Sequence, residues 1–504
     1  MGPQSSSERH QIVKNSFRYF SATLFGQIVG LVRSVLIPVL LIPTQLGVWN
    51  LMNVVVGYGG NAHLGILHGM NKLIPMLRGR GASTEVEQIK DSAFWVNVLL
   101  NAGWFVFVWM ALYAVPSAYS SALRITSVIV FLQGMYSYYF SLLRADSRFK
   151  LVSVGVGGLS ILSTIFVLGF GWFCADRLSG ALIGLAVTYG LIVLFWSLAS
   201  RYHFAFHVSR GAVRRSFEMG IPLTILGVVD SLFISIDRWV IVSYMGATVL
   251  GYYALGIMAS NLIGLVPGSI ANVLYPKMLE RFGASGSEVA LRGLMVGPIR
   301  AMAAVISLLI GGAVLILPLL IRFFVPKYLP SVSLFGILIS AAFFYASATI
   351  PGSFLVAINK QKILIKIQIV AILLALTLDV GVVNMGWGIV GIAWSTAFAY
   401  AVYGCGYMVT AAYYAFDRRS DMVNFLVEIY GLFVAMLLGL ILSTALIPAG
   451  KTIGIALIYT SLRLVLFLVI LLPVLWWSNR HTGLLAIVRE MFPAYFNKLR
   501  GRTL

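Results

Sequence analysis

The sequence predicts an all-α, polytopic membrane protein with about 14 transmembrane helices. Apolar residues make up 60% of the 504 residues, charged residues only 10%, and the mean hydropathy is +0.94. Such a chain has too few polar side chains to cover an aqueous surface. Uncharged runs long enough to cross a hydrocarbon core of about 30 Å also recur along the whole chain.

Turn signals divide the longest apolar runs, and this division gives fourteen spans. The weakest lies at 363–384, because its uncharged stretch between Lys366 and Asp379 has only twelve residues. It counts as a span since its charged residues lie near its ends. In chain order, the predicted spans are 17–42, 47–71, 92–114, 120–143, 151–174, 178–200, 217–245, 248–275, 296–322, 329–357, 363–384, 387–415, 425–447 and 453–477.

The distribution of Lys and Arg predicts the orientation of these spans. Of the 36 Lys and Arg residues, 28 fall in the N-terminal segment, the even-numbered connections and the C-terminal tail, and only five fall on the opposite side. Cytoplasmic connections carry such an excess. We therefore expect a plasma (inner) membrane protein with both termini in the cytoplasm. The net charge of +20 reflects this topology, and no nucleic-acid partner is expected.

An internal repeat with an offset of about 205 residues organises the chain. Leu46-Gly47 begins the second span and Leu250-Gly251 begins the eighth. Six spans per repeat predict two lobes related by a pseudo-two-fold axis along the membrane normal, the layout of an alternating-access transporter. The predicted parts are an N-lobe (1–200), a cytoplasmic linker (201–216), a C-lobe (217–415), two extra helices (416–480) and a cytoplasmic amphipathic tail (481–504).

Two arginines inside apolar helices are candidate substrate-binding residues. Arg33 is the only charged residue between Tyr19 and Pro43, and Arg238 lies in the related span of the second half. A charged residue in a membrane helix usually marks a functional site, and arginine presents a planar fork that matches phosphate oxygens. The alternative is an ion pair between Arg33 and Asp230 or Asp237.

Two aspartates of the seventh span are candidate ion-coupling residues. Asp230 and Asp237 are seven residues apart and so share one helical face, where they could carry a proton or a sodium ion. The alternative is that one of them neutralises Arg238. A third acid, Asp379, is expected at the membrane interface.

Further polar residues are expected to line a cavity. Asn61, His63 and His68 follow the flexible Gly57–Gly60 stretch in the second span, and Asn261 occupies the related region of the eighth. Hydrogen-bonded structural histidines are the alternative. The aromatic residues Tyr136, Tyr138, Tyr139 and Phe140 are expected to anchor the chain at the membrane interface, with stacking against sugar rings as the alternative.

These features together resemble a known family. The first-helix arginine, the Leu-Gly starts of the second and eighth spans, and Asp237-Arg238 followed by Gly246 and Leu250-Gly251-Tyr252-Tyr253-Ala254 resemble the Wzx-type polysaccharide flippases of the multidrug/oligosaccharidyl-lipid/polysaccharide exporter superfamily. The resemblance implies transfer of a polyprenyl-diphosphate-linked oligosaccharide from the inner to the outer leaflet. It implies this lipid-linked substrate, membrane lipids and other polysaccharide assembly proteins as partners.

Two other functions are open at this stage. A cation- or proton-coupled multidrug or toxin antiporter needs carboxylates in its cavity, yet the six acids of the first 200 residues all fall in predicted tails or connections. A membrane glycosyltransferase or polysaccharide polymerase needs catalytic groups in sizeable outer loops, and the predicted outer connections are short. We expect no enzyme activity, no catalytic residue, no metal and no cofactor.

Overall fold

The computed structural model describes residues 25–202, 204–206, 208–448, 450 and 452–482, and this part of the chain is helical and contains no strand. Twelve helices among these residues are long and apolar enough to cross a membrane. They correspond to the third to fourteenth predicted spans, so the all-α, membrane-spanning class is confirmed. The predicted amphipathic tail lies outside the described residues, apart from Thr482 and its neighbour. The chain divides into two compact units, Met1–Gly251 and Tyr252–Leu504.

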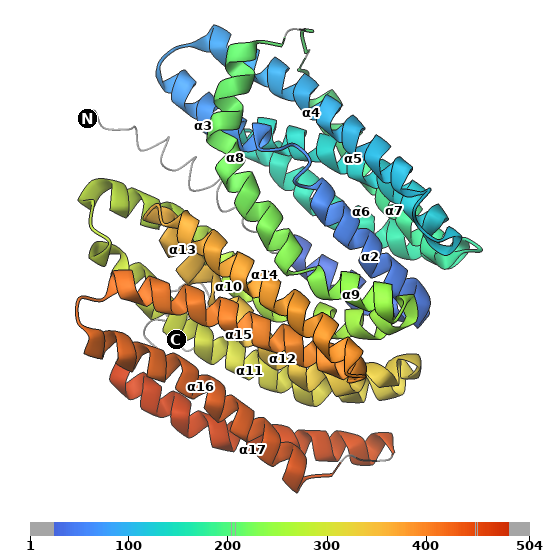
Figure 1. Cartoon of the computed structure of the whole chain (residues 1–504), viewed down its shortest axis with the longest axis vertical. Coiled ribbons are helices and arrows are strands. Elements are labelled where there is room, and N and C mark those ends of the chain that lie inside the picture. The colour runs from blue at the N-terminus through green and yellow to red at the C-terminus, as the bar shows by residue number, and fades with distance from the viewer. Residues whose placement is uncertain (1–24, 203, 207, 449, 451, 483–504) are drawn as a thin grey trace, which may run out of the picture. The chain divides into compact units, whose positions relative to one another are not determined.

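Unit 1 is a bundle around one apolar core (Figure 1). α6 packs along α7, α5 packs against α4 and α7, and α3 packs against α8. Tyr138 and Trp196 are fully buried at its centre. The helices are Phe25–Leu40, α2 (Pro43–Gly59), α3 (Ile66–Gly79), α4 (Ser83–Ala111), α5 (Ser117–Ala145), α6 (Phe149–Phe173), α7 (Arg177–Ser200), α8 (Arg210–Phe233), α9 (Ile236–Tyr244) and the start of α10 (Ala247–Ser285).

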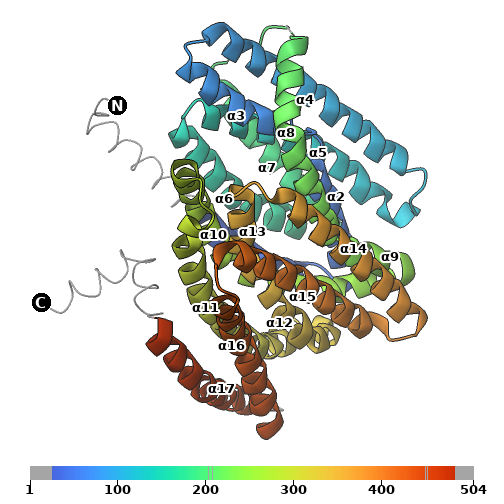
Figure 2. The same cartoon turned by 60° about the vertical axis from the view of Figure 1, so that its left-hand side comes forward.

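Unit 2 is a second bundle, in which α12 and α14 both pack on α15. α16 and α17 lie side by side and pack on α11 (Figure 2). Arg300 on α11 joins Glu428 on α16 through an ion pair of 2.8 Å. The helices after α10 are η1 (Val289–Leu291), α11 (Arg292–Phe324), η2 (Pro326–Ser331), α12 (Val332–Ser347), α13 (Thr349–Ala357), α14 (Gln361–Asn384), α15 (Gly388–Ala415), α16 (Arg419–Leu446) and α17 (Ile453–Thr482).

The two units do not coincide with the lobes expected from the repeat. α8 and α9, which the repeat assigns to the C-lobe, are part of unit 1, because α8 packs against α3 and α4. The division falls after Gly251, within α10, and not in the 201–216 linker. The two lobes, which were inferred from the duplicated spans, therefore stay a prediction.

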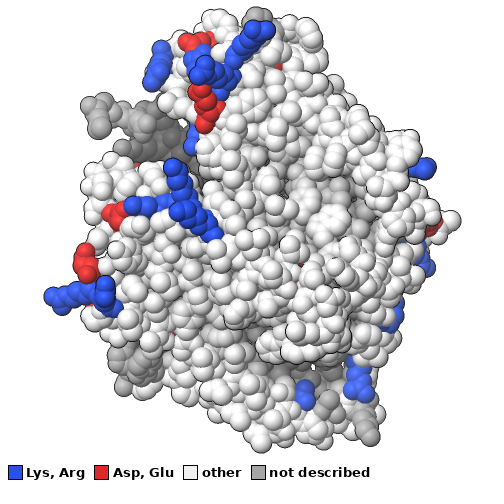
Figure 3. Space-filling model, viewed as in Figure 1, with Lys and Arg blue, Asp and Glu red and all other residues white. Residues whose placement is uncertain are grey.

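The surface between the helix ends is apolar, as lipid contact requires. On the face drawn in Figure 3, most of the surface is uncharged, and Lys, Arg, Asp and Glu occupy small groups. Trp394 and Phe107 are among the large apolar side chains that are more than half exposed. Buried against lipid tails, such side chains need no protein partner.

The second predicted span, 47–71, is not one continuous helix. α2 ends at Gly59, turns occupy the next residues, and α3 begins at Ile66. The φ angles are +47° at Leu64 and +100° at Gly65, in the left-handed region, so the right-handed helix α3 cannot extend back toward α2 through these residues. The seventh span is also divided, into α8 and α9, with Ser235 between them.

α3 and α8 touch through their backbones. A Cβ atom added to Gly220 would lie 1.8 Å from the carbonyl oxygen of Gly65, and one added to Gly69 would lie 2.0 Å from that of Ser216. Each helix thus presents two small residues four positions apart, the spacing that lets membrane helices approach closely. The break in the second span is therefore held against α8 at Gly65.

The repeated Leu-Gly pairs mark a second close contact. A Cβ on Gly47 would lie 1.9 Å from the Ala247 carbonyl oxygen, and one on Gly251 would lie 1.8 Å from that of Pro43. Beside them, the hydroxyl oxygens of Thr44 and Thr248 are 2.7 Å apart. The first turns of α2 and α10 thus pack on each other through equivalent positions of the repeat.

Two interfacial assignments were wrong. Tyr138 and Tyr139 are 0% and 6% exposed and belong to the core of unit 1, where Tyr138 packs edge-on against Phe94. Asp379 is 0% exposed inside unit 2, because it lies on the face of α14 that packs on α15. Position near a span end does not tell which face of a helix is covered.

Candidate functional site

A set of polar contacts joins the break in the second span to the end of α8. The Tyr58 and Ser235 hydroxyl oxygens are 2.6 Å apart, and the Trp239 indole N–H donates to the Tyr58 oxygen at 2.9 Å. The Asn61 amide Nδ2 donates to the Ser231 hydroxyl oxygen at 3.2 Å. Polar groups at this depth are satisfied by one another, as an apolar surrounding demands.

The candidate charged residues of α8 and α9 lie next to these contact residues in the sequence. Asp237 is buried, and its Oδ1 accepts the backbone N–H of Arg238 at 2.8 Å. This places a carboxylate in the first turn of α9, where the helix dipole favours negative charge. Asp230 is half-buried one turn before the end of α8.

Arg238 has an unused donor. Its Nε is buried and has no hydrogen-bond partner among the described residues. A buried guanidinium donor without an acceptor costs free energy.

Arg33 lies in a different part of unit 1. It is half-buried on the helix at Phe25–Leu40, and its Nη1 donates to the Ser163 hydroxyl oxygen on α6 at 2.6 Å. The ion pairs found between described residues do not include Arg33, so the alternative pairing with Asp230 or Asp237 is not formed in this structure. A neutral hydroxyl leaves the positive charge of Arg33 uncompensated at this contact.

The two histidines of the second span lie together. The His63 and His68 ring centroids are 4.9 Å apart at an interplanar angle of 79°. The backbone N–H of Gly65 donates to His63 Nδ1 at 3.0 Å, so neutral His63 carries its proton on Nε2. The hydrogen bond to Gly65 is consistent with the structural alternative for His63.

Asn261, the remaining sequence-derived candidate, is on α10 in unit 2. Its side chain is exposed. The other candidates all belong to unit 1, and of these the structure joins Asn61 to α8 and His63 to His68.

A cavity of about 580 Å³ opens beside the break in the second span. Three segments line it: the break itself, α4 and α8. Among the sequence-derived candidates only Asn61 contributes to the lining. The lining residues are Tyr58, Asn61, Ala62, Leu64, Leu99, Leu100, Gly103, Trp104, Phe107, Val228 and Leu232.

Sequence reasoning missed the residues that organise this region. Tyr58, Ser231 and Trp239 carry the hydrogen bonds between the break and α8. The available signal was the spacing of Gly227, Ser231 and Ser235, which repeats every four residues and so places three small or polar residues on one face.

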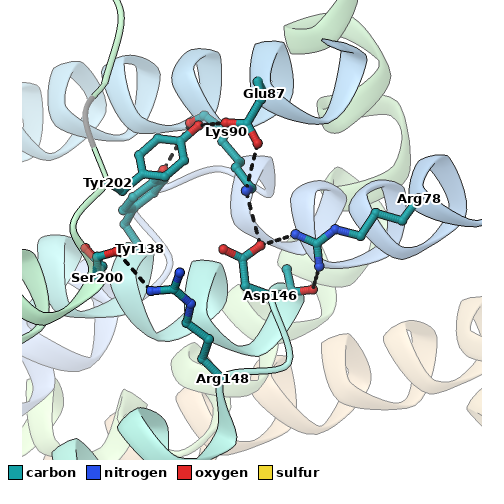
Figure 4. A network of polar contacts seen from close by, with 9 residues as sticks. Arg78, Glu87, Lys90, Tyr138, Asp146, Arg148, Ser200 and Tyr202 are labelled. Atoms are coloured by element: carbon teal, nitrogen blue, oxygen red, sulfur yellow. Dashed lines mark hydrogen bonds and ion pairs between the residues drawn. The ribbon is translucent and has the colours of Figure 1, made fainter. Parts of the chain in front are cut away.

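A charged network, also missed, ties α3, α4 and α5 together (Figure 4). Lys90 is 4% exposed, and its Nζ is 3.2 Å from Asp146 Oδ1 and 3.1 Å from Glu87 Oε1. Arg78 also pairs with Asp146 and donates to the Ala145 carbonyl oxygen at 2.7 Å. Lys90 was assigned to a connection, but α4 begins at Ser83, so it lies inside a helix.

Two tyrosine hydroxyls complete the network around Lys90. The Tyr138 hydroxyl donates to the Lys90 carbonyl oxygen at 3.1 Å, and the Tyr202 hydroxyl donates to Glu87. Burial, together with the hydrogen bond to Glu87, raises the pKa of the Tyr202 phenol, so this group stays a donor. The network fastens the segment after α7 to α4, and its charges are matched internally.

Comparisons with known proteins give relatives of one kind. The family described as polysaccharide biosynthesis protein matches residues 12–282. An O-antigen transporter candidate of Shigella flexneri is 23% identical over 339 residues, which cover 64% of this chain and 79% of that protein. The chain therefore has both the predicted helical architecture and a sequence match to this family.

Solved structures share the fold. The lipid II flippase MurJ in an inward closed conformation aligns with a TM-score of 0.65 and 16% identity, over 90% of this chain and 97% of that one. The Vibrio cholerae MATE transporter VcmN in its bent form aligns with a TM-score of 0.55 and 16% identity, over 83% and 100%. A MOP superfamily transporter from Pyrococcus furiosus gives 0.53 and 11%, over 82% and 96%. At these identities the likeness is one of fold.

Proposed function

Because this chain belongs to the family of polysaccharide biosynthesis proteins, we propose that it is a flippase that moves a polyprenyl-diphosphate-linked oligosaccharide from the inner to the outer leaflet. It is a multi-pass membrane transporter of the MOP superfamily. The names of an O-antigen transporter candidate among its relatives and of a lipid II flippase among its fold neighbours support a glycolipid substrate. The proposed location is the inner membrane, with both termini in the cytoplasm and other polysaccharide assembly proteins as partners.

The observation that carries the proposal is the state of the two arginines. Arg33 donates to a neutral serine, and Arg238 keeps a buried Nε that has no acceptor within the described part of the chain. An arginine within a membrane span costs free energy, at least about 2.5 to 3.5 kcal/mol on insertion scales where it lies at the helix centre. A diphosphate would offset this cost through charge-assisted hydrogen bonds.

The other candidates take roles that suit the same substrate. Asn61, His68 and Asn261 offer amide and imidazole groups to sugar hydroxyls, whereas His63 holds the break through Gly65. Asp230 and Asp237 are the proposed ion-coupling carboxylates, since they are the acids nearest to Arg238 in the chain. Two lobes that alternate in access would carry the polar head across while most of the polyprenyl tail stays in lipid.

Replacing either arginine is expected to reduce flipping by at least about tenfold, the loss of one charge-assisted hydrogen bond. The variants are Arg33→Gln and Arg238→Gln, assayed in liposomes with a fluorescent lipid-linked oligosaccharide. Arg463→Gln is the matched control, because Arg463 is also within a helix but donates to the Ile447 carbonyl oxygen. Flipping that is unchanged in both test variants would refute the anion-site assignment.

A disulfide between positions 44 and 248 is expected to stop transport. The two hydroxyl oxygens are 2.7 Å apart, so the variant Thr44→Cys/Thr248→Cys brings the sulfurs within bonding reach after a small rotation. In the proposed alternation of access the first turns of α2 and α10 separate, and the bond would prevent this. Transport should fall to background on oxidation and return on reduction. Full transport by the oxidised protein, with the disulfide verified by mass spectrometry, would contradict alternating access at this contact.

A further inference from the structure

The cavity beside the break, hereafter the α4–α8 cleft, has a polar end and apolar walls. Tyr58 and Asn61 supply polar groups at the break, and Leu99, Phe107 and Leu232 supply apolar surface from α4 and α8. No charged residue is part of its lining. Leu99 and Phe107 are 71% and 57% exposed, so the apolar side opens outward and does not belong to a sealed core.

The cleft exists because α4 lacks a side chain at its centre. Leu99, Gly103 and Phe107 are four residues apart and form one stripe along the helix. A Cβ atom added to Gly103 would meet nothing within 4 Å. The glycine thus leaves a gap between two large apolar side chains, and the volume of about 580 Å³ is within the range of about 300–1,000 Å³ typical of ligand sites.

Two observations indicate a ligand with a polar head and an apolar chain. Trp104 lines the cleft, and its indole Nε1 is buried without a hydrogen-bond partner among the described residues. At the polar end, Tyr58 accepts from Trp239, the residue next to Arg238. The order from Asn61 and Tyr58 to Leu99 and Phe107 is therefore polar, then apolar.

We propose that the α4–α8 cleft binds the first isoprenoid units of the lipid substrate, with the polar end of the lipid toward Tyr58 and Asn61. The inference rests on the proposed function, and it adds a specific place for the chain next to the head. Each buried methylene contributes about 0.8 kcal/mol, so the cleft would add affinity that does not depend on the sugar. A polyprenyl phosphate has a polar head and an apolar chain, as the cleft has a polar end and apolar walls, whereas a soluble ligand would leave the apolar walls in contact with water.

The test uses the full chain in vesicles of phosphatidylethanolamine and phosphatidylglycerol with a diazirine-bearing isoprenyl phosphate as the photolabel. Label is expected on peptides of α4 and α8, displaced by unlabelled polyprenyl phosphate but not by added phosphatidylglycerol. Gly103→Trp fills the gap and should lower labelling at least about tenfold, the loss of about two buried methylenes. Gly103→Ala and Val106→Trp, the latter at a 53% exposed position outside the lining, should label within about twofold of the natural chain.

The result also separates this inference from the proposed function. Labelling that is unchanged by Gly103→Trp, or displaced equally by phosphatidylglycerol, would overturn the isoprenoid site even if the natural chain flips lipid-linked oligosaccharide. Specific labelling that Gly103→Trp removes supports the site even if no oligosaccharide is flipped, in which case only the proposed function fails.

Discussion

Gly220→Val is expected to prevent stable folding of unit 1. A Cβ at this position would lie 1.8 Å from the Gly65 carbonyl oxygen and 2.6 Å from its carbonyl carbon. These are backbone atoms, so no side-chain rotation relieves the overlap, and α3 and α8 must separate. Separation uncovers Ile66 and Met70, both 0% exposed. Overpacking costs about 1–3 kcal/mol where neighbours can adjust, and the cost here should be at the upper end or beyond.

The measurement is the monodisperse fraction after size-exclusion chromatography in mild detergent, followed by thermal unfolding. Gly211→Val is the matched control on the same helix. Position 211 is exposed, and the nearest atom to its added Cβ is the Ser209 hydroxyl oxygen at 3.9 Å. We expect the control to behave as the natural chain and Gly220→Val to aggregate. Equal yields and equal unfolding temperatures would show that the α3–α8 contact is dispensable.

Asp146→Ala is expected to destabilise unit 1 by about 3 kcal/mol, because it leaves a buried ammonium group with a weaker partner. The Lys90 side chain is 5% exposed and would keep only Glu87, whose side chain is 53% exposed. Arg78 would lose its carboxylate as well and keep the Ala145 carbonyl oxygen. Since Arg78 is 40% exposed, water compensates much of that second loss.

A double-mutant cycle separates the charge from the packing. Lys90→Met in the Asp146→Ala background removes the buried positive charge and should recover a large part of the lost free energy of unfolding. Glu218→Ala is the surface control, because its pair with Arg214 is 58% and 83% exposed and should contribute less than about 0.5 kcal/mol. Additive effects of Lys90→Met and Asp146→Ala would mean that the ion pair does not hold the network together.

Composition and run length predicted the fold class well, because a lipid environment leaves few alternatives to apolar helices. The breaks within spans could not be predicted in the same way, because they depend on contacts between distant parts of the sequence. Leu64 and Gly65 adopt positive φ where the chain meets Gly220, and that contact joins residues far apart in the sequence. A glycine in a span can serve packing, bending or a turn, and only its neighbours decide which.

The candidate site was predictable in its charges but not in its partners. Arg33 and Arg238 are conspicuous because apolar residues surround them in the sequence. Ser163, which accepts from Arg33, is 130 residues away. Lys90 was misjudged since the run of charges from Glu85 to Asp91 looks like a connection, whereas α4 continues through it and buries part of it. A span boundary drawn from hydropathy lies where the charged residues begin, whereas the helix itself continues through them.

The break in the second span also sets an order of events during synthesis. Asn61 bonds to Ser231, 170 residues later in the chain. At about 5–20 residues per second, a ribosome needs on the order of ten seconds or more to supply that partner. Until then, the segment around Asn61, with its amide, two imidazoles and unpaired backbone groups, has no α8 to bind in the membrane or at its edge. We therefore expect this segment to stay in contact with the insertion machinery, and not with lipid, until α8 has been synthesised and binds it.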